Sequence, residues 1–579
     1  MTVHCDGGEA TQVTSEGAGR PTARPRALVI ALLLCAWGTG VPPAAADRPA
    51  KADLVIGVSQ FPSTFHPNVE SMAAKAYILG FTHRPFTAHD PKWRLVPMLA
   101  VDLPTIENRG AVPELAPGGR RGVAVTYRIQ PRATWGDGTP VTTRDVLFAW
   151  RVGRNPQSGV ANVEFYRSVY RVEVVDEKTF TLHYDRLTFD YNALPQFNVL
   201  PAHLDEKNFA DPANYKNRTA YDTDRTNPGL YFGPYRIAQV SPNVQVVLVP
   251  NPTWWGEKPV FRRIVVRVIE NTAALEANLL SGAIDMIAGE VGFTVDQAFA
   301  LERRQGARYR FLYRAGLFYE HIDLNLDNPF LKDLRVRQAL LYAVDREGVS
   351  RHLFGGRQPV AHTFLNPLDA GAAAGLRQYG YDPQKAASLL DSAGWRRTGD
   401  GIRRNARGER LALEFRTTAG NRTRELVQQV FQNQWKRIGV DVRIRNEPAR
   451  VFFGQTLARR KFGALALYAS ITSPESVPRS RYHSSEIPTA RNGFAGQNYA
   501  GFRSAEADRL IPAIEEELDP KKRKRLWRAL QELYVEELPT LPLFFRAEPY
   551  ILPLWLRNVV PTGHENPTTL WVEKWRVQP

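Results

Sequence analysis

The chain has 579 residues but only two cysteines, Cys5 and Cys35, and both stand in its first 46 residues. The rest of the sequence therefore has no thiol with which to form a disulfide, a thiolate metal site or a catalytic cysteine. Long apolar runs are equally scarce, since no stretch after residue 46 approaches the roughly 18 uninterrupted apolar residues of a membrane-spanning helix. A disulfide framework and an internal membrane span are thus not expected.

The sequence also lacks the short motifs that mark common catalytic sites. It contains no Walker loop, no G-x-G-x-x-G, no G-x-S-x-G and no H-E-x-x-H. Its 11 histidines are scattered, and the closest pair, His83 and His89, has the wrong spacing for one helical face around a metal. We therefore expect no enzyme activity, no cofactor and no metal site. A secreted hydrolase with an unrecognised site is the alternative from another class.

The first 46 residues have the order of a secretory signal peptide: a basic edge, an apolar run and a site of small residues. The apolar run would span about 16 Å as a helix, roughly half of a bilayer core. We expect cleavage near Ala46 and a mature protein in the periplasm. The three parts are Arg20, Arg24 and Arg26, then ALVIALLLCAW at 27–37, then the A-x-A site formed by Ala44 and Ala46.

Cys35 lies inside this segment and raises the question of a lipid anchor. A lipobox places a small residue before its cysteine, but Leu34 takes that position here. We do not expect lipidation, although the sequence alone leaves it open.

Positive charge exceeds negative charge, with 75 Lys and Arg against 59 Asp and Glu, a net charge of +16. The excess is dispersed, so a nucleic-acid partner is not expected. It either keeps the chain soluble or favours an anionic partner. The one dense basic run, at 521–525, follows Asp519 and Pro520 and precedes Leu526, Leu530 and Leu533. This order predicts the solvated face of an amphipathic helix.

Local patterns predict a mixed α and β protein. LVIGV at 54–58 and VQVVLV at 244–249 read as strands. Thr142 and Asp145 fit a capping box that opens a helix through Trp150, and a second helix runs from Asp382 to Ala393, where Gly394 stops it. The segment 411–445 reads as strand, helix and strand, which predicts a parallel pair with a right-handed crossover. The length implies at least two lobes.

Aromatic residues make up 11% of the chain and cluster in segments that read as loops. Large rigid rings suit ligand clefts, and they suit buried cores equally well. Both interpretations stay open for the three clusters, which are Phe61 with Phe65, Trp254 with Trp255, and Phe544 with Phe545.

Several segments, in the same order along the chain, resemble the extracellular solute-binding proteins of family 5, the oligopeptide- and dipeptide-binding class. Each motif alone is modest, but their order from about 130 to 545 makes coincidence hard to sustain. They are WGDGTP at 135–140 with TTRDV at 142–146, GPY at 233–235 with NPTWW at 251–255, SGAID at 281–285, DLRVRQAL at 333–340 with AVDR at 343–346, YDP at 381–383 with AGW at 393–395, and ELP at 537–539 with PLF at 542–544.

The resemblance implies an α/β fold of the periplasmic-binding-protein type (type II, cluster C-like), with two lobes that close on a ligand by a hinge motion and an extra β-rich domain. By that analogy the signal peptide is 1–46, lobe I combines 47–95, 225–318 and 545–579, the extra domain is 96–224, and lobe II is 319–544.

The resemblance also implies a function: a periplasmic substrate-binding protein of an ABC transporter that captures peptide-like solutes. Its partners would be the permease and ATPase subunits of the importer, it would meet the membrane only through the permease, and we expect a monomer. Specificity would come from backbone hydrogen bonds and water. The alternative keeps the fold and changes the solute to a sugar, an opine or a metal chelate.

One segment departs from the family pattern. In peptide binders a Trp followed shortly by an Asp pairs with the ammonium group of the peptide, but here the segment 464–475 reads ALALYASITSPE. Tyr468 stands at the Trp position, Ser470 and Thr472 replace the Asp, and Glu475 is the first carboxylate. Losing a charge-assisted bond would cost about 1.5–3 kcal/mol. We therefore expect a blocked or modified peptide, or a non-peptide solute, without preference for a free amine.

Arg479 and Arg481 follow this segment and could meet a carboxylate or phosphate, or belong to a solvated loop. The full set of candidate ligand-binding residues is Phe61, Phe65, Tyr468, Ser470, Thr472, Glu475, Arg479, Arg481 and Phe545.

Overall fold

The computed structural model describes residues 51–69, 72–194, 197–492, 494 and 496–578. The predicted signal peptide, with Cys5, Cys35 and the cleavage site at Ala44 and Ala46, lies outside the described residues. Within these ranges no helix is long and apolar enough to cross a membrane.

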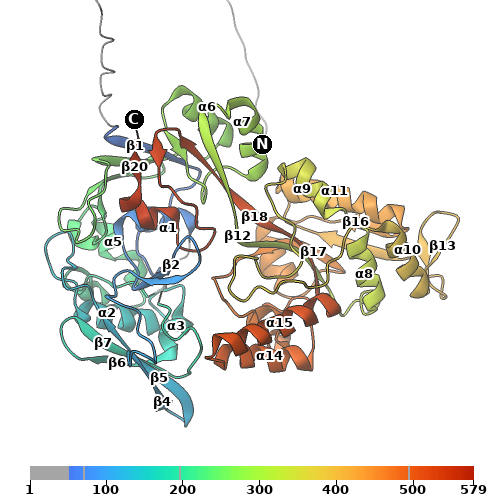
Figure 1. Cartoon of the computed structure of the whole chain (residues 1–579), viewed down its shortest axis with the longest axis horizontal. Helices are drawn as coiled ribbons and strands as arrows, with labels where there is room; N and C mark the ends of the chain where they lie inside the picture. Colours follow the sequence, from blue (N-terminus) through green and yellow to red (C-terminus); the bar gives the residue numbers. More distant parts are fainter. Residues whose placement is uncertain (1–50, 70–71, 195–196, 493, 495, 579) are drawn as a thin grey trace, which may run out of the picture. The chain divides into compact units, whose positions relative to one another are not determined.

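A mixed sheet of 10 strands organises the fold (Figure 1). Its strand order is β16-β15-β17-β12-β18-β11-β1-β10-β9-β8. In chain order the strands are β1 (Asp53–Val58), β8 (Tyr235–Ser241), β9 (Gln245–Pro250), β10 (Arg263–Val268), β11 (Met286–Ile287), β12 (Tyr309–Leu324), β15 (Ala412–Arg416), β16 (Asp441–Ile444), β17 (Leu465–Ser470) and β18 (Thr540–Pro553).

The two longest strands, β12 and β18, pair antiparallel and join the two halves of this sheet. The first half contains β11, β1, β10, β9 and β8, and the second half contains β17, β15 and β16. The end of β18 pairs with β11 in the first half, whereas the end of β12 pairs with β17 in the second half. Their register shifts between Ala315 and Tyr319 of β12. At this break Gly316 approaches the backbone of Gly563, and a Cβ on Gly316 would lie 2.3 Å from the Gly563 carbonyl oxygen. The shift interrupts the ladder where the halves meet.

The first half is built on β1, which confirms the strand predicted at 54–58. Leu54, Ile56 and Val58 are buried, and β1 runs parallel to both β10 and β11. The predicted strand at 244–249 is confirmed as β9. The helices of this half are α1 (Ala73–Thr82), α6 (Thr272–Ser281) and α7 (Val295–Gln305), with the 3-10 segment η7 (Thr568–Lys574).

A separate antiparallel sheet of four strands lies within 96–224. Its order is β4-β5-β7-β6, and α2 (Thr143–Arg154) begins at the predicted capping box, where Thr142 and Asp145 satisfy each other's backbone N–H groups. The helix runs one turn beyond Trp150. The strands are β4 (Ala111–Ala116), β5 (Arg120–Arg128), β6 (Val169–Val174) and β7 (Thr179–Tyr184), and a short helix, α3 (Val163–Ser168), precedes β6.

The second half contains the predicted strand–helix–strand unit. β15 and β16 are parallel and are joined by α11 (Arg422–Arg437), which buries Phe431 and Trp435. Gly439 adopts a φ of +86° after this helix, as its predicted stop requires. The other helices are α8 (Leu334–Tyr342), α9 (Arg346–Phe354), α10 (Pro383–Ser392), α14 (Ala505–Glu516) and α15 (Pro520–Glu537).

The basic run opens α15 as predicted. The Asp519 side chain accepts hydrogen bonds from the backbone N–H groups of Lys521 and Lys522. Leu530 is buried, while Leu526 and Leu533 are half-buried against the core that contains Trp527 and Tyr534. The helix at 382–393 is likewise confirmed, since α10 begins after the Asp382 cap and Gly394 has a φ of +84°.

The remaining elements are short: β2 (Thr87–His89), β3 (Leu95–Pro97), α4 (Ala202–Asp205), η1 (Glu206–Ala210), η2 (Tyr215–Asn217), α5 (Ala220–Thr223), η3 (Pro228–Leu230), β13 (Arg396–Arg397), β14 (Arg403–Arg404), α12 (Ala449–Val451), the π-helical η4 (Phe452–Leu457), α13 (Arg479–Tyr482), η5 (Ser484–Glu486), η6 (Ala490–Asn492), β19 (Leu556–Arg557) and β20 (Arg576–Val577).

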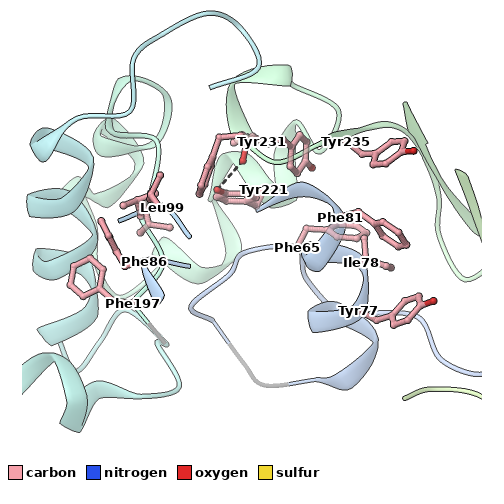
Figure 2. Packing of buried hydrophobic residues seen from close by; sticks show 14 of the residues in the cluster. Phe65, Tyr77, Ile78, Phe81, Phe86, Leu99, Phe197, Tyr221, Tyr231 and Tyr235 are labelled. Atoms are coloured by element: carbon pink, nitrogen blue, oxygen red, sulfur yellow. Dashed lines mark hydrogen bonds between the residues drawn. The ribbon is translucent and has the colours of Figure 1, made fainter. Parts of the chain in front are cut away.

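Each half has its own hydrophobic core. The core of the first half extends into the four-stranded sheet, and Figure 2 shows Phe65 among its buried side chains together with Ile78 and Phe81 of α1. The core of the second half forms around α8, α11 and β17.

Candidate functional site

A cavity of about 310 Å³ lies beside β12 and β18, where the two halves meet. We call it the central cavity. Loops that follow β1 and β11 line it from the first half, at residues 59–60 and 289–296, and the start of α11 lines it from the second half. Thr423 of α11 donates a hydrogen bond of 3.4 Å to Asp296 of α7 across its edge.

Charged side chains of the two long strands face this cavity. Glu320 of β12 accepts hydrogen bonds from Arg424 of α11 (3.0 and 3.1 Å) and from Arg546 of β18 (2.6 and 3.2 Å). Burial acts to raise the pKa of Glu320, but the charges and hydrogen bonds of Arg546 and Arg424 prevail and hold this pKa at about 2. The guanidinium of Arg546 also lies 4.6 Å from the ring centroid of Phe318. This wall of the central cavity therefore carries an ionised Glu320 that is held by two arginines.

Two further carboxyl groups, Glu290 and Glu548, line the same cavity. Oε1 of Glu290 accepts hydrogen bonds from the backbone N–H (2.8 Å) and the hydroxyl (2.7 Å) of Thr568. Oε2 of Glu548 accepts one from the Tyr550 hydroxyl at 3.0 Å. Burial raises the pKa of both carboxyls, and the charge of Glu290 raises the pKa of Glu548 further.

A second cavity, of about 560 Å³, lies between residues 184–193 and residues 473–479. We call it the loop cavity. The carboxylate of Glu515 accepts two hydrogen bonds from Arg479, of 2.8 and 2.6 Å, and the Glu515 carbonyl accepts one of 2.9 Å from the Phe189 N–H. Arg523 lies 4.3 Å from the ring centroid of Phe189. The two contacts of Phe189 tie 96–224 to the second half.

Glu475 lines the loop cavity in a strained backbone conformation, with a φ of +58°. Its backbone N–H donates a hydrogen bond of 2.8 Å to Oδ2 of Asp369. Burial, and after it the charge of Asp369, raises the pKa of the Glu475 carboxyl. No ion pair of this carboxyl occurs among the residues that the structure describes.

Tyr468 belongs to the core rather than to a cavity wall. Its hydroxyl donates a hydrogen bond of 2.6 Å to Asp323, and its ring centroid lies 4.5 Å from that of His321. Ser470 pairs with Tyr319 in the sheet, and its hydroxyl oxygen is buried without a hydrogen-bond partner. Thr472 is half-buried just beyond β17. None of the three lines either cavity.

Of the aromatic residues selected from the sequence, Phe65, Phe544 and Phe545 are buried, whereas Phe61, Trp254 and Trp255 are half-buried. Phe61 and Phe65 pack edge to face with ring centroids 6.1 Å apart. Phe545 is buried against Tyr319 at 5.7 Å. Its neighbour Phe544 does line the central cavity. Trp254 and Trp255 contact Arg84 and Phe232 respectively.

Arg481 lies 5.9 Å from the ring centroid of Tyr482, and its Nη1 is buried without a hydrogen-bond partner. Of the nine residues selected from the sequence, the structure thus brings Glu475 and Arg479 to a cavity. It adds Glu290, Glu320, Arg424, Arg546 and Glu548, which sequence reasoning missed. One signal was present: charges alternate at 546 and 548 within the apolar stretch FFRAEPYIL of β18.

Among the described residues no group of three or more His, Cys, Asp or Glu side chains is placed to hold a metal ion. The carboxylates of the central cavity are paired with arginine or hydrogen-bonded to hydroxyls instead.

Comparison with known proteins identifies the family and the fold. Residues 115–487 match the family model of the bacterial extracellular solute-binding proteins, family 5 middle. The chain is 25% identical over 500 residues to the oligopeptide-binding protein AppA of Bacillus subtilis, a match that covers 85% of this chain and 86% of that protein.

Two solved structures confirm the predicted two-lobed α/β fold. The oligopeptide-binding protein from Thermus thermophilus, complexed with a pentapeptide, matches with a TM-score of 0.69 at 30% identity, over 91% of this chain and 96% of that chain. NikA from Brucella suis, in complex with Fe(III)-EDTA, matches with a TM-score of 0.74 over 91% and 100%. At its 19% identity the second likeness shows the fold alone.

Proposed function

Because the chain belongs to the bacterial extracellular solute-binding proteins of family 5, we propose that it captures a peptide-like solute and delivers it to the permease and ATPase of an ABC importer. The observation that carries the proposal is the central cavity, which draws its walls from both halves of the sheet at the point where β12 and β18 join them. A solute held there would contact both lobes at once.

A solute bound between the two lobes would favour the closed arrangement of the protein. A ligand that contacts both lobes stabilises the arrangement in which they are close, and the register shift at Ala315–Tyr319 interrupts the ladder between them. We propose that the lobes are 47–95 with 225–318 and 545–579, and 319–544, with 96–224 as the extra domain. The boundaries 318/319 and 544/545 both fall inside the two joining strands, β12 and β18.

The names of relatives support a peptide as the solute. The relatives from Bacillus subtilis and Thermus thermophilus are oligopeptide-binding proteins. The alternative is the same fold with a sugar, an opine or a metal chelate, and NikA, complexed with Fe(III)-EDTA, shows that the fold holds a chelate.

We further propose that the chain is a non-catalytic receptor, exported to the periplasm, monomeric, and in contact with the membrane only through its permease. The ligand-binding set selected from the sequence remains part of the proposal for Glu475 and Arg479, which line the loop cavity. For Phe65 and Phe545 a binding role requires the lobes to move apart, because their rings are buried in the cores, whereas Phe61 is half-buried against Phe65.

Titration with a pool of short peptides, followed by calorimetry, thermal melting and X-ray scattering, tests this function. At 100 times the dissociation constant a ligand adds about 2.7 kcal/mol to the free energy of unfolding. We expect a higher melting temperature together with a smaller radius of gyration. A higher melting temperature without compaction would refute closure, and no binding of any peptide would refute the peptide assignment.

A further inference from the structure

We propose that the Glu290–Glu548 carboxyl pair of the central cavity binds a cationic group of the solute, an ammonium or a guanidinium. The inference rests on the proposed function, because it names the charge of the solute that the same cavity takes. Glu290 and Glu548 both lie outside the segment 464–475. Within that segment Glu475 is the only carboxylate that could bind a cation.

The pair stands apart from the other carboxylate wall of the cavity. Glu320 has two arginine partners, whereas neither Glu290 nor Glu548 forms an ion pair with any described residue. Both Thr568 donors reach Oε1 of Glu290, so Oε2 of this carboxyl is left buried without a hydrogen-bond partner. A buried carboxyl oxygen without a donor at a cavity wall is suited to accept a hydrogen bond from a cationic group of a solute.

The backbone brings the two carboxyls together. Glu290 follows β11 directly after Gly289, which packs against the ring of Tyr550, and a Cβ on Gly289 would lie 2.4 Å from that ring. Only a residue without a Cβ allows the loop this close to β18. Glu548 stands two residues before Tyr550 on the same strand and accepts a hydrogen bond from its hydroxyl, so both carboxyls lie near Tyr550, and the charge of Glu290 acts on the pKa of Glu548.

The groups that surround the pair supply hydrogen bonds but no free cation. Tyr550 of β18 and Thr568 of η7 donate to it. Tyr77 of α1 is fully buried, its hydroxyl has no hydrogen-bond partner, and the charge of Glu290 adds to burial in raising its pKa.

Two arginines stand nearby, and both are engaged elsewhere. Arg546 of β18 is hydrogen-bonded to Glu320. Arg314 of β12 lies opposite Glu548 in the sheet, but its guanidinium donates to the backbone carbonyls of Thr562 and Pro91. The remaining carboxylate at the cavity edge, that of Asp296, accepts a hydrogen bond from the Thr423 hydroxyl.

Two buried carboxyls side by side do not both ionise at neutral pH, so the empty pair holds a proton. A cation that enters between them allows both to ionise, and the proton leaves to solvent. Binding is therefore accompanied by proton release, and affinity for a cation rises with pH until the empty pair has lost its own proton. A neutral solute gains nothing from the pair.

Calorimetric titration with three peptides tests the proposal: trialanine, N-acetyl-trialanine, which has no cation, and N-acetyl-Ala-Lys-Ala amide, whose cation is on the side chain. For the wild type we expect at least a tenfold preference for a cation-bearing peptide, about 1.4 kcal/mol. The first and third peptides distinguish a terminal amine from a side-chain amine. Two buffers of different ionisation enthalpy report the released proton.

Glu290→Gln and Glu548→Gln should each lose the preference and the proton release, while the control Glu302→Gln, on α7 and paired with Arg357, should keep both. The pKa values of both carboxyls are raised in the folded protein, so wild-type stability falls as pH rises from the ordinary carboxyl pKa toward these raised values. The glutamine variants should lose less stability over this range, which also shows that they fold.

Equal binding of charged and neutral peptides to the wild type would overturn the inference, and so would a preference that survives in both glutamine variants. Failure of all three peptides to bind would instead refute the peptide assignment. The pair is then tested in the same way with n-butylammonium against 1-butanol, and equal binding of these two would overturn the inference as well.

Discussion

Glu320 and Arg546 are joined by a hydrogen bond of 2.6 Å between Oε1 and Nη2, and they belong to the two strands, β12 and β18, that connect the lobes. With Arg424 added from α11, the three charges tie both strands to the second lobe beside the central cavity. The Glu320–Arg546 contact therefore forms part of the wall of the central cavity and also part of the connection between the lobes.

Glu320→Gln is predicted to remove an acid-sensitive part of the stability. The pKa of Glu320 is held at about 2, below its ordinary 4.5, so its stabilisation is complete above pH 4.5 and is lost as pH falls toward 2. A shift of this size corresponds to about 3 kcal/mol. Urea unfolding of both proteins between pH 2 and pH 7 measures the difference.

The control for this experiment is Glu506→Gln, which removes an exposed carboxylate paired with Arg509. It should change stability by less than about 1 kcal/mol at any pH. Parallel pH profiles for the wild type and Glu320→Gln would show that the triad does not carry the acid dependence.

Gly316→Ala is predicted to disturb the joint between the lobes. Its Cβ would lie 2.3 Å from the carbonyl oxygen of Gly563, so one of the two backbone segments must move. Overpacking of this kind costs about 1–3 kcal/mol. Gly380→Ala is the matched control, since a Cβ there meets nothing within 4 Å. Melting curves of the two variants give the comparison, and equal melting temperatures would argue against a tight approach at Gly316.

Glu475→Gln is predicted to leave any preference between free and N-acetylated peptides unchanged. Glu475 lines the loop cavity, whereas the proposed cation site is in the central cavity. Its carboxyl already has a raised pKa through burial and Asp369, so it carries charge at a cost. Calorimetry with matched peptides checks this. Loss of a tenfold preference in this variant alone would place the anchor at Glu475.

Export is predicted to remove the first 46 residues. The basic edge, apolar run and A-x-A site predict a mature N-terminus near Asp47. N-terminal sequencing of protein from the periplasmic fraction measures it. Recovery of residues before Ala44 in the mature pool would exclude this cleavage.

Local chemistry made much of the fold predictable. The Thr142–Asp145 capping box and the strand–helix–strand unit at 411–445 depend on neighbouring residues, and the structure confirms both. The motifs that carry the family resemblance also depend on nearby residues. In the landmark at 135–146, the indole N–H of Trp135 donates to Asp145, which also accepts from the N–H of Ala202. This landmark is scaffold, so it identified the family without locating the site.

The central cavity escaped prediction because its charged groups come from distant parts of the chain. Glu320, Arg424 and Arg546 are separated by more than 100 residues from one another. The pairing of β12 with β18 brings Glu320 and Arg546 together, and the pairing of β12 with β17 and of β17 with β15 brings the start of α11 to them. The segment 464–475 drew attention because the family resemblance pointed to it, yet Tyr468 packs on His321 and binds Asp323 in the core.

Mass spectrometry of the solute carried through purification from the native periplasm tests the central claim most directly. The protein is denatured after extensive washing, and the released small molecules are compared with those from a sample that was unfolded, washed and refolded first. The account predicts one or more short peptides bearing a positively charged group, absent from the refolded sample. Release of a sugar, an opine or a metal chelate instead, with no peptide, would contradict it.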